Sequence, residues 1–158
     1  MHMIREKNKN LKVHIVKDEL NEYIPSDYKI KKWARNSFIK NKKAAVVIKI
    51  ASMNNMREIK SRFSKDKTIC NVLSFPNTSV YFSKFNNLGD IIICASIVNK
   101  ESRHYLKKND NRWAHMITHS MLHLQGYNHK NKKERDIMEK KEIKLMSQLG
   151  LSNPYYAE

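Results

Sequence analysis

Residues 118–129, THSMLHLQGYNH, contain three of the seven histidines of the chain. His119 and His123 are four residues apart, so on a helix their side chains lie one above the other on the same face. Gly126 is well placed to end this helix in a left-handed conformation and turn the chain back. His129 can then approach the other two histidines from the loop. The stretch therefore predicts a helix and a turn that together gather three imidazoles.

Three neutral imidazoles can occupy three corners of a tetrahedron around a metal ion and leave the fourth corner open for water. That arrangement is typical of catalytic zinc sites, whereas structural sites are closed by four protein ligands. We therefore predict that His119, His123 and His129 bind one zinc ion, although nickel, cobalt and copper suit the same ligands. His115 lies one turn before His119, and we expect it to be partly buried or to support a ligand.

The histidine spacing also matches the metzincin protease pattern H-E-x-x-H-x-x-G-x-x-H. In those proteases the glutamate is the general base that activates water for attack on the peptide bond. Ser120 occupies the position of that glutamate here. The sequence thus keeps the three ligands and lacks the base, which argues against the alternative of a zinc metalloprotease.

The charge of the chain points to a polyanionic partner. Its 158 residues suit a single domain spanning 1–158, which we expect to be a monomer. Lys and Arg number 31 against 15 Asp and Glu, for a net charge of +16. A field of that sign attracts nucleic acid, especially RNA or DNA backbones. An AT-rich genome also raises lysine content, so charge alone does not identify the partner.

Nothing in the sequence predicts a membrane or secreted protein. There is no run of about 18 apolar residues, as a transmembrane helix requires. The N-terminal sequence MHMIREKNKNLKV is charged and lacks the apolar segment of a secretory signal. Cys70 and Cys94 are far apart and form no disulfide framework, so we interpret them as reduced, partly buried residues. We expect a cytoplasmic protein without a membrane partner.

Apolar patterning predicts a mixture of strands and helices. Strands are expected at 12–20, 43–51, 69–76 and 90–98, with an edge strand around 79–82. Helices are expected from about Tyr28, after the capping residue Ser52, at 99–107, at 111–125 and at 132–149. Because the helices gather toward the end of the chain, the predicted fold class is α+β.

Two of these helices have an apolar face that we expect to be buried. In the helix after Ser52 this face comprises Met56, Ile59 and Phe63. In the last helix it comprises Ile137, Met138, Leu145, Met146 and Leu149.

The chain resembles a known family at several motifs. RWAHMITHSMLHLQGYNH (112–129) is similar to the histidine motif of the YbeY endoribonucleases, the rRNA maturation factors, usually written H-G-x-L-H-L-x-G-Y-D-H. NVLSFP (71–76) resembles the family segment T-[DN]-V-L-S-F-P, and LGDIIIC (88–94) resembles its L-G-D-I-x-I strand. LGLSNPY (149–155) is similar to the family's C-terminus. The motifs follow the family's order over roughly residues 45–155.

The resemblance implies an α+β fold with a mixed, roughly four-stranded sheet and a zinc-bearing helix packed against it. It implies that His119, His123 and His129 hold the zinc ion. The implied activity is that of a metal-dependent, single-strand-specific endoribonuclease. The implied role is maturation of the 3′ end of small-subunit (16S-type) rRNA and ribosome quality control in the bacterial cytoplasm. RNA and the small ribosomal subunit would be its partners.

Two departures from the family pattern affect the expected site. Asn128 replaces the aspartate before the third ligand, which removes a negative charge near the metal. The family places a cleft-facing arginine seven residues before the [DN] of V-L-S-F-P, and this position is Ser64 here. Arg62 can replace it as a catalytic residue if the loop is longer, and Lys65 or Lys67 could also supply the charge.

Several questions stay open at the level of sequence. RNA carries its own nucleophile, so either water or the 2′-OH could attack the phosphate. Ser74 and Asp90 either line the cleft or close turns. A metal that only holds the C-terminal turn would make the chain a non-catalytic RNA-binding ribosome-assembly factor. Metal removal separates the two alternatives, because a chain that needs a structural metal unfolds without it.

Overall fold

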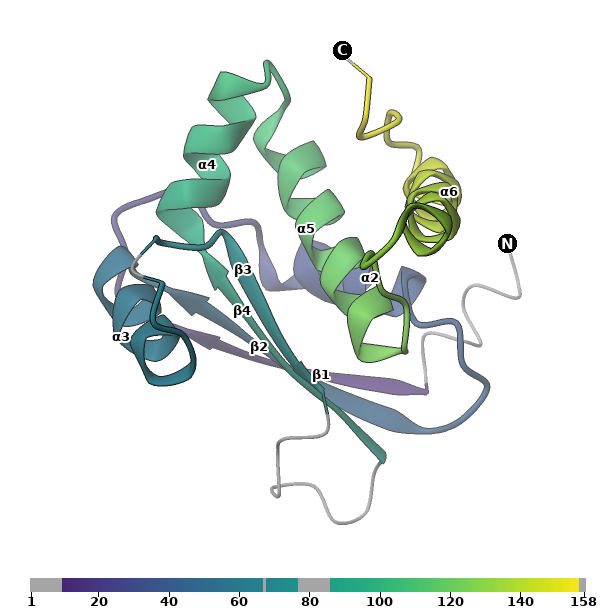
Figure 1. Ribbon diagram of the computed structural model, residues 1–158, viewed down its shortest axis with the longest axis horizontal. Coiled ribbons are helices and arrows are strands. Elements are labelled where there is room, and N and C mark those ends of the chain that lie inside the picture. Colours follow the sequence, from purple (N-terminus) through teal and green to yellow (C-terminus); the bar gives the residue numbers. More distant parts are fainter. Residues whose placement is uncertain (1–9, 67, 77–85, 157–158) are drawn as a thin grey trace.

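The strands are β1 (Leu11–Lys17), β2 (Ala44–Ala51), β3 (Val72–Pro76) and β4 (Asn86–Cys94). They form one four-stranded sheet in the order β1-β2-β4-β3 (Figure 1). β1, β2 and β4 are parallel, and β3 pairs antiparallel with β4. The structure is a computed structural model and describes residues 10–66, 68–76 and 86–156. The mixed sheet and its helices confirm the predicted α+β class.

The helices lie on both sides of this sheet (Figure 1). Those of the described residues are α2 (Asp27–Asn36), α3 (Met53–Phe63), α4 (Ala95–His104), α5 (Asn109–Leu124) and α6 (Lys132–Gln148). α2 and α5 pack on one face, with α4 and α6 beside α5, and α3 packs on the other face. The histidine-bearing helix α5 therefore packs against the sheet, as the sequence predicts.

The alternation of side chains along β4 explains these two layers. Ile91 and Ile93 are fully buried in the larger core cluster together with Trp113 of α5. Ile92, between them, points to the opposite face and packs in a second cluster with Met56 of α3. A strand covered on both faces is typically a continuous apolar run, as this one is.

The structure corrects the predicted boundary between the strand at 90–98 and the helix at 99–107. β4 ends at Cys94, where its parallel partner β2 also ends, so the chain enters α4 directly. Ala95 and Val98 are both buried, which keeps the sequence apolar past the end of the strand. An apolar run by itself does not separate a buried strand from a buried helix.

Two residues of the predicted apolar helix faces are exposed. Phe63 is the last residue of α3 and is 68% exposed, with its ring centroid 4.8 Å from that of Phe75. Ile137 of α6 is 50% exposed, whereas Met138 and Leu145 are buried. Ile137 lies outside the buried stripe of α6, which comprises Met138, Glu142, Leu145 and Met146.

The remaining sequence expectations concern short segments. The strand predicted at 69–76 begins only at Val72, and the edge strand predicted around 79–82 lies outside the described residues. Cys70 is partly buried and Cys94 fully buried, and both are free thiols. Within the described part of the chain, no helix has the length and apolar character needed to cross a membrane.

Candidate metal centre

The core holds α5 in a fixed position. Trp113, Ile117 and Met121 are spaced four residues apart on the helix, and each is fully buried. The indole nitrogen of Trp113 also donates a hydrogen bond of 2.7 Å to the side-chain oxygen of Asn99 on α4. A helix anchored along one stripe presents its other side chains at defined positions, which a metal site requires.

His119 and His123 lie one turn apart on α5, and their Nε2 atoms are 3.0 Å apart. The helix then ends at a glycine in the left-handed region, since Gly126 has a φ of 99°. The amides of Gly126 and Tyr127 donate to the carbonyls of His123 and Leu122 at 3.1 and 3.0 Å. This is the predicted C-terminal cap, and it reverses the chain direction.

The turn brings His129 back to the two helical histidines. Its ring centroid lies 5.4 Å from that of His119 and 4.8 Å from that of His123. The three nitrogen atoms that could bind a metal lie within 4.8 Å of one another. His119 and His123 are half-buried and His129 is exposed, so the group opens toward solvent. The structure thus brings together the three histidines singled out in the sequence.

This donor set fits a divalent transition metal. Imidazole must be neutral to bind a metal ion. Burial, and then the proximity of His119 and His129, lowers the pKa of His123 to about 4, so its ring is unprotonated at neutral pH. Three neutral nitrogen donors with one open side suit zinc and also cobalt, nickel or copper. The three-histidine group could therefore hold a metal ion.

A buried glutamate fixes the orientation of His119. Glu142 of α6 is 1% exposed, and one carboxylate oxygen accepts a hydrogen bond of 3.0 Å from Nδ1 of His119. The other oxygen accepts from the Tyr155 hydroxyl at 2.7 Å and from Nε2 of His115. With its proton on Nδ1, His119 keeps the Nε2 lone pair free for a metal. Carboxylate partners of this kind set the tautomer of metal-binding histidines.

The same hydrogen bonds keep Glu142 ionised. Burial by itself raises the pKa of this carboxyl, but the hydrogen bonds from His115 and His119 outweigh burial and lower the pKa to about 2. Burial also lowers the pKa of His115, although the adjacent Glu142 opposes this shift. The result is a fixed negative charge behind His119, which makes the imidazole a stronger metal donor.

Glu142 and Tyr155 are not among the site residues predicted from the sequence. Glu142 lies on the buried face of α6 together with Met138 and Leu145. An acidic residue inside an apolar helical stripe is unusual, and this pattern could have identified it. Tyr155 follows the last helix in an irregular segment, where no periodicity marks its role. His115 is 5% exposed and bonds to Glu142, which is the supporting position expected for it.

Arg62 lies apart from the three histidines. It belongs to α3, on the opposite face of the sheet from α5, and pairs with Glu58 at 2.8 Å on the surface. Ser64 directly follows α3, Lys65 is exposed, and Lys67 lies outside the described residues. A catalytic role for Arg62 therefore stays a prediction, and no contact of Arg62 in the described structure supports it.

Three polar residues near the motifs have clear positions. Ser120 is fully buried, and among the described residues its hydroxyl has no hydrogen-bond partner, so it faces the core. Ser74 pairs with Ile91 in the β3–β4 ladder and lies on the face that α5 covers. Asp90 pairs with Phe75, which packs toward α3, so it lies on the other face. This position does not favour Asp90 as a lining residue of the metal centre.

Fold and site together define a class of α+β proteins in which a helix and its following turn present three histidines that could hold a metal ion. Within that class, the model of the endoribonuclease YbeY family matches residues 4–150, and the chain belongs to this family. Endoribonuclease YbeY of Buchnera aphidicola subsp. Cinara cedri is 38% identical over 155 residues, covering 92% of this chain and 99% of the relative. Endoribonuclease YbeY of Methylococcus capsulatus is 36% identical over 132 residues, covering 84% and 87%.

A solved structure has a similar fold. The solution structure of a protein from Thermotoga maritima matches with a TM-score of 0.52 and 18% identity, covering 87% of this chain and 91% of that chain. At this identity the likeness supports the fold alone. The resemblance inferred from the sequence motifs is confirmed by the family match.

Proposed function

We propose that this protein is a zinc-dependent, single-strand-specific endoribonuclease in which His119, His123 and His129 hold the zinc ion. The proposal rests on one observation: three imidazole nitrogens lie within 4.8 Å of one another in a group that opens toward solvent. RNA as the substrate is supported by membership of the endoribonuclease YbeY family and by the names of its relatives.

The residues of the site would have different roles in such a reaction. A zinc ion, when bound, acts as a Lewis acid toward phosphate oxygens and lowers the pKa of water. The three histidines leave one side of the site open to the substrate. Glu142 keeps His119 in the tautomer that presents Nε2. Ser120 is buried at the position of the protease base, so this position supplies no proton acceptor, and the nucleophile would be either water or the RNA 2′-OH.

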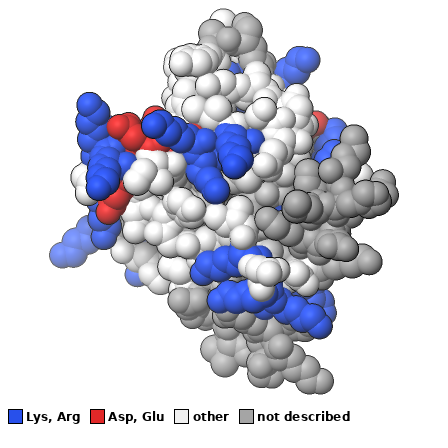
Figure 2. Space-filling view, turned by 90° about the vertical axis from the view of Figure 1, so that its right-hand side faces the viewer, with Lys and Arg blue, Asp and Glu red and all other residues white. Residues whose placement is uncertain are grey.

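Positive charge near the third ligand is suited to hold the RNA backbone. Lys130, Lys132 and Lys133 follow His129 closely and are all exposed. Figure 2 shows the side of the molecule on which α6 lies, where Lys and Arg side chains exceed Asp and Glu among the described residues. With a net charge of +16, binding to phosphates should weaken as salt rises.

The proposed natural substrate is the 3′ end region of small-subunit rRNA, and the proposed role is rRNA maturation and ribosome quality control. We place the protein in the bacterial cytoplasm as a monomer that meets the small ribosomal subunit. This part of the proposal rests on the family motifs at 71–76, 88–94 and 112–129. The metalloprotease alternative has no support, because the position of its base is occupied by the buried Ser120.

The experiment that tests the proposal is cleavage of a small-subunit rRNA 3′ fragment by zinc-loaded protein. His119→Ala, purified in the same way, should lose cleavage while it keeps a cooperative thermal unfolding transition. His14→Ala is the matched control, because His14 is exposed on β1 and belongs to no candidate ligand group among the described residues. Equal cleavage by the wild type and His119→Ala would reveal a contaminating nuclease. No cleavage by the wild type would favour a non-catalytic RNA-binding assembly factor.

A further inference from the structure

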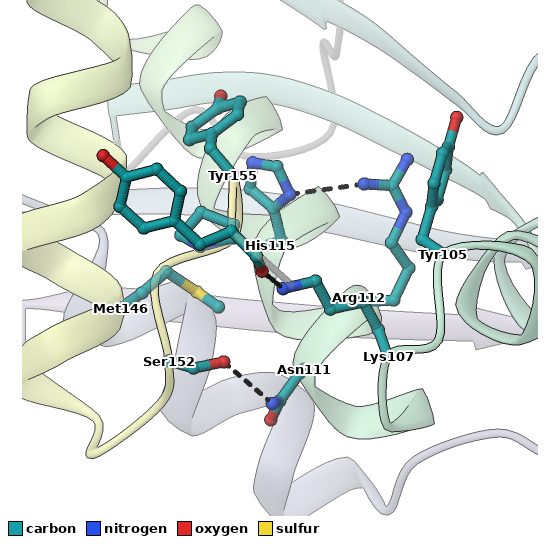
Figure 3. A pocket seen from close by; sticks show the side chains of 10 residues that line it. Tyr105, Lys107, Asn111, Arg112, His115, Met146, Ser152 and Tyr155 are labelled. Carbon is teal, nitrogen blue, oxygen red and sulfur yellow. Dashed lines mark hydrogen bonds between the residues drawn. The ribbon is translucent and has the colours of Figure 1, made fainter. Parts of the chain in front are cut away.

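A cavity is lined by His115, which lies one turn before His119 on α5 (Figure 3). Its volume is about 470 Å³, and it lies between the C-terminal segment and the region where α4 passes into α5. Figure 3 shows Tyr155 on the C-terminal segment, with Arg112 and Tyr105 across from it. A preformed, partly apolar cavity with a few polar groups is the usual form of a small-ligand site.

The walls of this cavity are held in place by hydrogen bonds. The ammonium of Lys107 donates to the backbone carbonyl of Tyr156 and, at 3.3 Å, to that of Asn153. The hydroxyl of Tyr155 donates to Glu142 at 2.7 Å. These contacts tie the C-terminal segment to α6 and to the loop before α5. These hydrogen bonds preorganise the cavity, so the binding of a ligand needs little further ordering of its walls.

The chemistry of the walls selects flat rings over bare phosphate. The guanidinium of Arg112 lies 5.3 Å from the ring centroid of Tyr105, within the range of a cation–π contact. It also pairs with Glu101 at 3.2 Å and lies 3.4 Å from Nδ1 of His115, so its charge is already engaged. Tyr105 and Tyr156 are 51% and 71% exposed, which leaves ring surface available. Tyrosine and guanidinium planes are the surfaces on which unpaired RNA bases stack.

His115 links the wall of the cavity to the metal centre through contacts with Glu142 and His119. His115 lines the cavity and precedes His119 by one turn of α5, with 6.4 Å between their ring centroids. Glu142 bonds to both histidines. A ligand in the cavity therefore lies about one helical turn from a proposed metal ligand.

From this arrangement we infer that the cavity binds one base of the single-stranded RNA, which places the neighbouring part of the strand at the metal centre. The inference rests on the proposed endoribonuclease function and adds to it a base-binding subsite formed by Tyr105, Arg112 and Tyr156. Such a subsite accepts only unpaired bases, because a base inside a duplex cannot stack on a protein ring. It therefore supplies a physical reason for single-strand specificity.

The test measures binding of fluorescein-labelled hexauridylate to the zinc-loaded full chain by anisotropy, with the RNA checked for integrity afterward. Tyr105→Ala and Tyr156→Ala should each weaken binding about tenfold, the size of one base–ring stack. Tyr105→Phe keeps the ring and should bind like the wild type. Tyr28→Ala is the matched control, because Tyr28 is 74% exposed and does not line the cavity. Thermal unfolding of every variant identifies any loss of fold.

Photocrosslinking of a 4-thiouridine hexamer locates the bound base independently of the variants. Adducts are expected at Tyr105, or at Tyr155 and Tyr156. The subsite would be overturned if the wild type cleaves RNA while the alanine variants bind it as tightly as the wild type. It would also be overturned if adducts form only at other residues. In both cases the proposed function would stand. A wild type that neither binds nor cleaves RNA would overturn both.

Discussion

Glu142 and His119 are joined by a 3.0 Å hydrogen bond between α6 and α5, although 23 positions separate them in the sequence. The bond runs from Nδ1 of His119, so the Nε2 atom of the ring is directed at the other two histidines. The same carboxylate also binds His115 and Tyr155. α6 and the C-terminal segment therefore take part in building the candidate metal centre.

Glu142→Gln should lower zinc affinity by about 10- to 100-fold, as is usual when the partner of a metal-binding histidine is lost. The amide has one acceptor oxygen and removes the negative charge, so it cannot accept from His115, His119 and Tyr155 as the carboxylate does. Competition with a chromophoric chelator measures the affinity.

Asp136→Asn is the control for this variant. Asp136 is exposed on the same helix, so its change removes an equal charge without touching the histidines. Zinc affinity should stay at the wild-type value. If Glu142→Gln also binds zinc like the wild type, the carboxylate does not orient His119 for metal binding.

Gly126→Ala should reduce both stability and zinc affinity. The φ of 99° strains any residue with a Cβ, at a cost of about 1–2 kcal/mol. Relief of that strain shifts the turn that carries His129. Gly150→Ala is a close match, because Gly150 has a φ of 74° and, like Gly126, has open space around an added Cβ.

Both glycine variants should therefore unfold at lower temperature, but only Gly126→Ala should lose zinc affinity. Thermal unfolding and zinc titration of the two proteins distinguish these effects. Equal zinc affinity in both variants would show that the position of His129 does not depend on the turn.

Chelation of the metal should leave the protein folded. The larger core cluster contains none of the three candidate ligands, so burial of apolar surface does not depend on them. A bound metal adds stability by mass action, about 2.7 kcal/mol at a hundredfold excess over Kd. Far-UV circular dichroism of the metal-free protein should match that of the loaded protein, with a lower unfolding temperature. Loss of the helical spectrum would instead favour a structural metal.

The half of the site that lies on α5 and its turn was predictable from the sequence. His119, His123 and Gly126 lie within eight positions, and helix geometry fixes how such residues relate. Glu142 and Tyr155 could not be placed in this way, because their positions depend on how α6 packs against α5. Local periodicity carries no information about that packing.

In the sheet, too, the local sequence predicts some features, and tertiary packing determines the others. The apolar runs at 43–51 and 90–98 located two central strands, because continuous β-branched sequence is typical of strands buried on both faces. The point where β4 passes into α4 depends on where the partner strand β2 ends. That point is set by tertiary structure and not by the local sequence. The position of Arg62 on the α3 side likewise follows from which face of the sheet α3 covers.

Ser120→Ala should leave RNA cleavage unchanged and keep or raise stability, by up to about 1 kcal/mol. The Ser120 hydroxyl is buried and lacks a hydrogen-bond partner among the described residues, so its removal relieves a desolvation cost. Alanine also has the higher helix propensity. Thermal unfolding and the rRNA cleavage assay measure the two effects.

Thr118→Val provides the contrast, because the Thr118 hydroxyl is equally buried but accepts a hydrogen bond of 3.1 Å from Ser37. Its loss leaves the Ser37 hydroxyl with one acceptor fewer, and we expect a destabilisation of about 1 kcal/mol. Opposite shifts of the two unfolding temperatures would support the assignment of Ser120 to the core. Loss of cleavage in a folded Ser120→Ala protein would instead place the hydroxyl in the reaction, at the position where metzincin proteases carry their base.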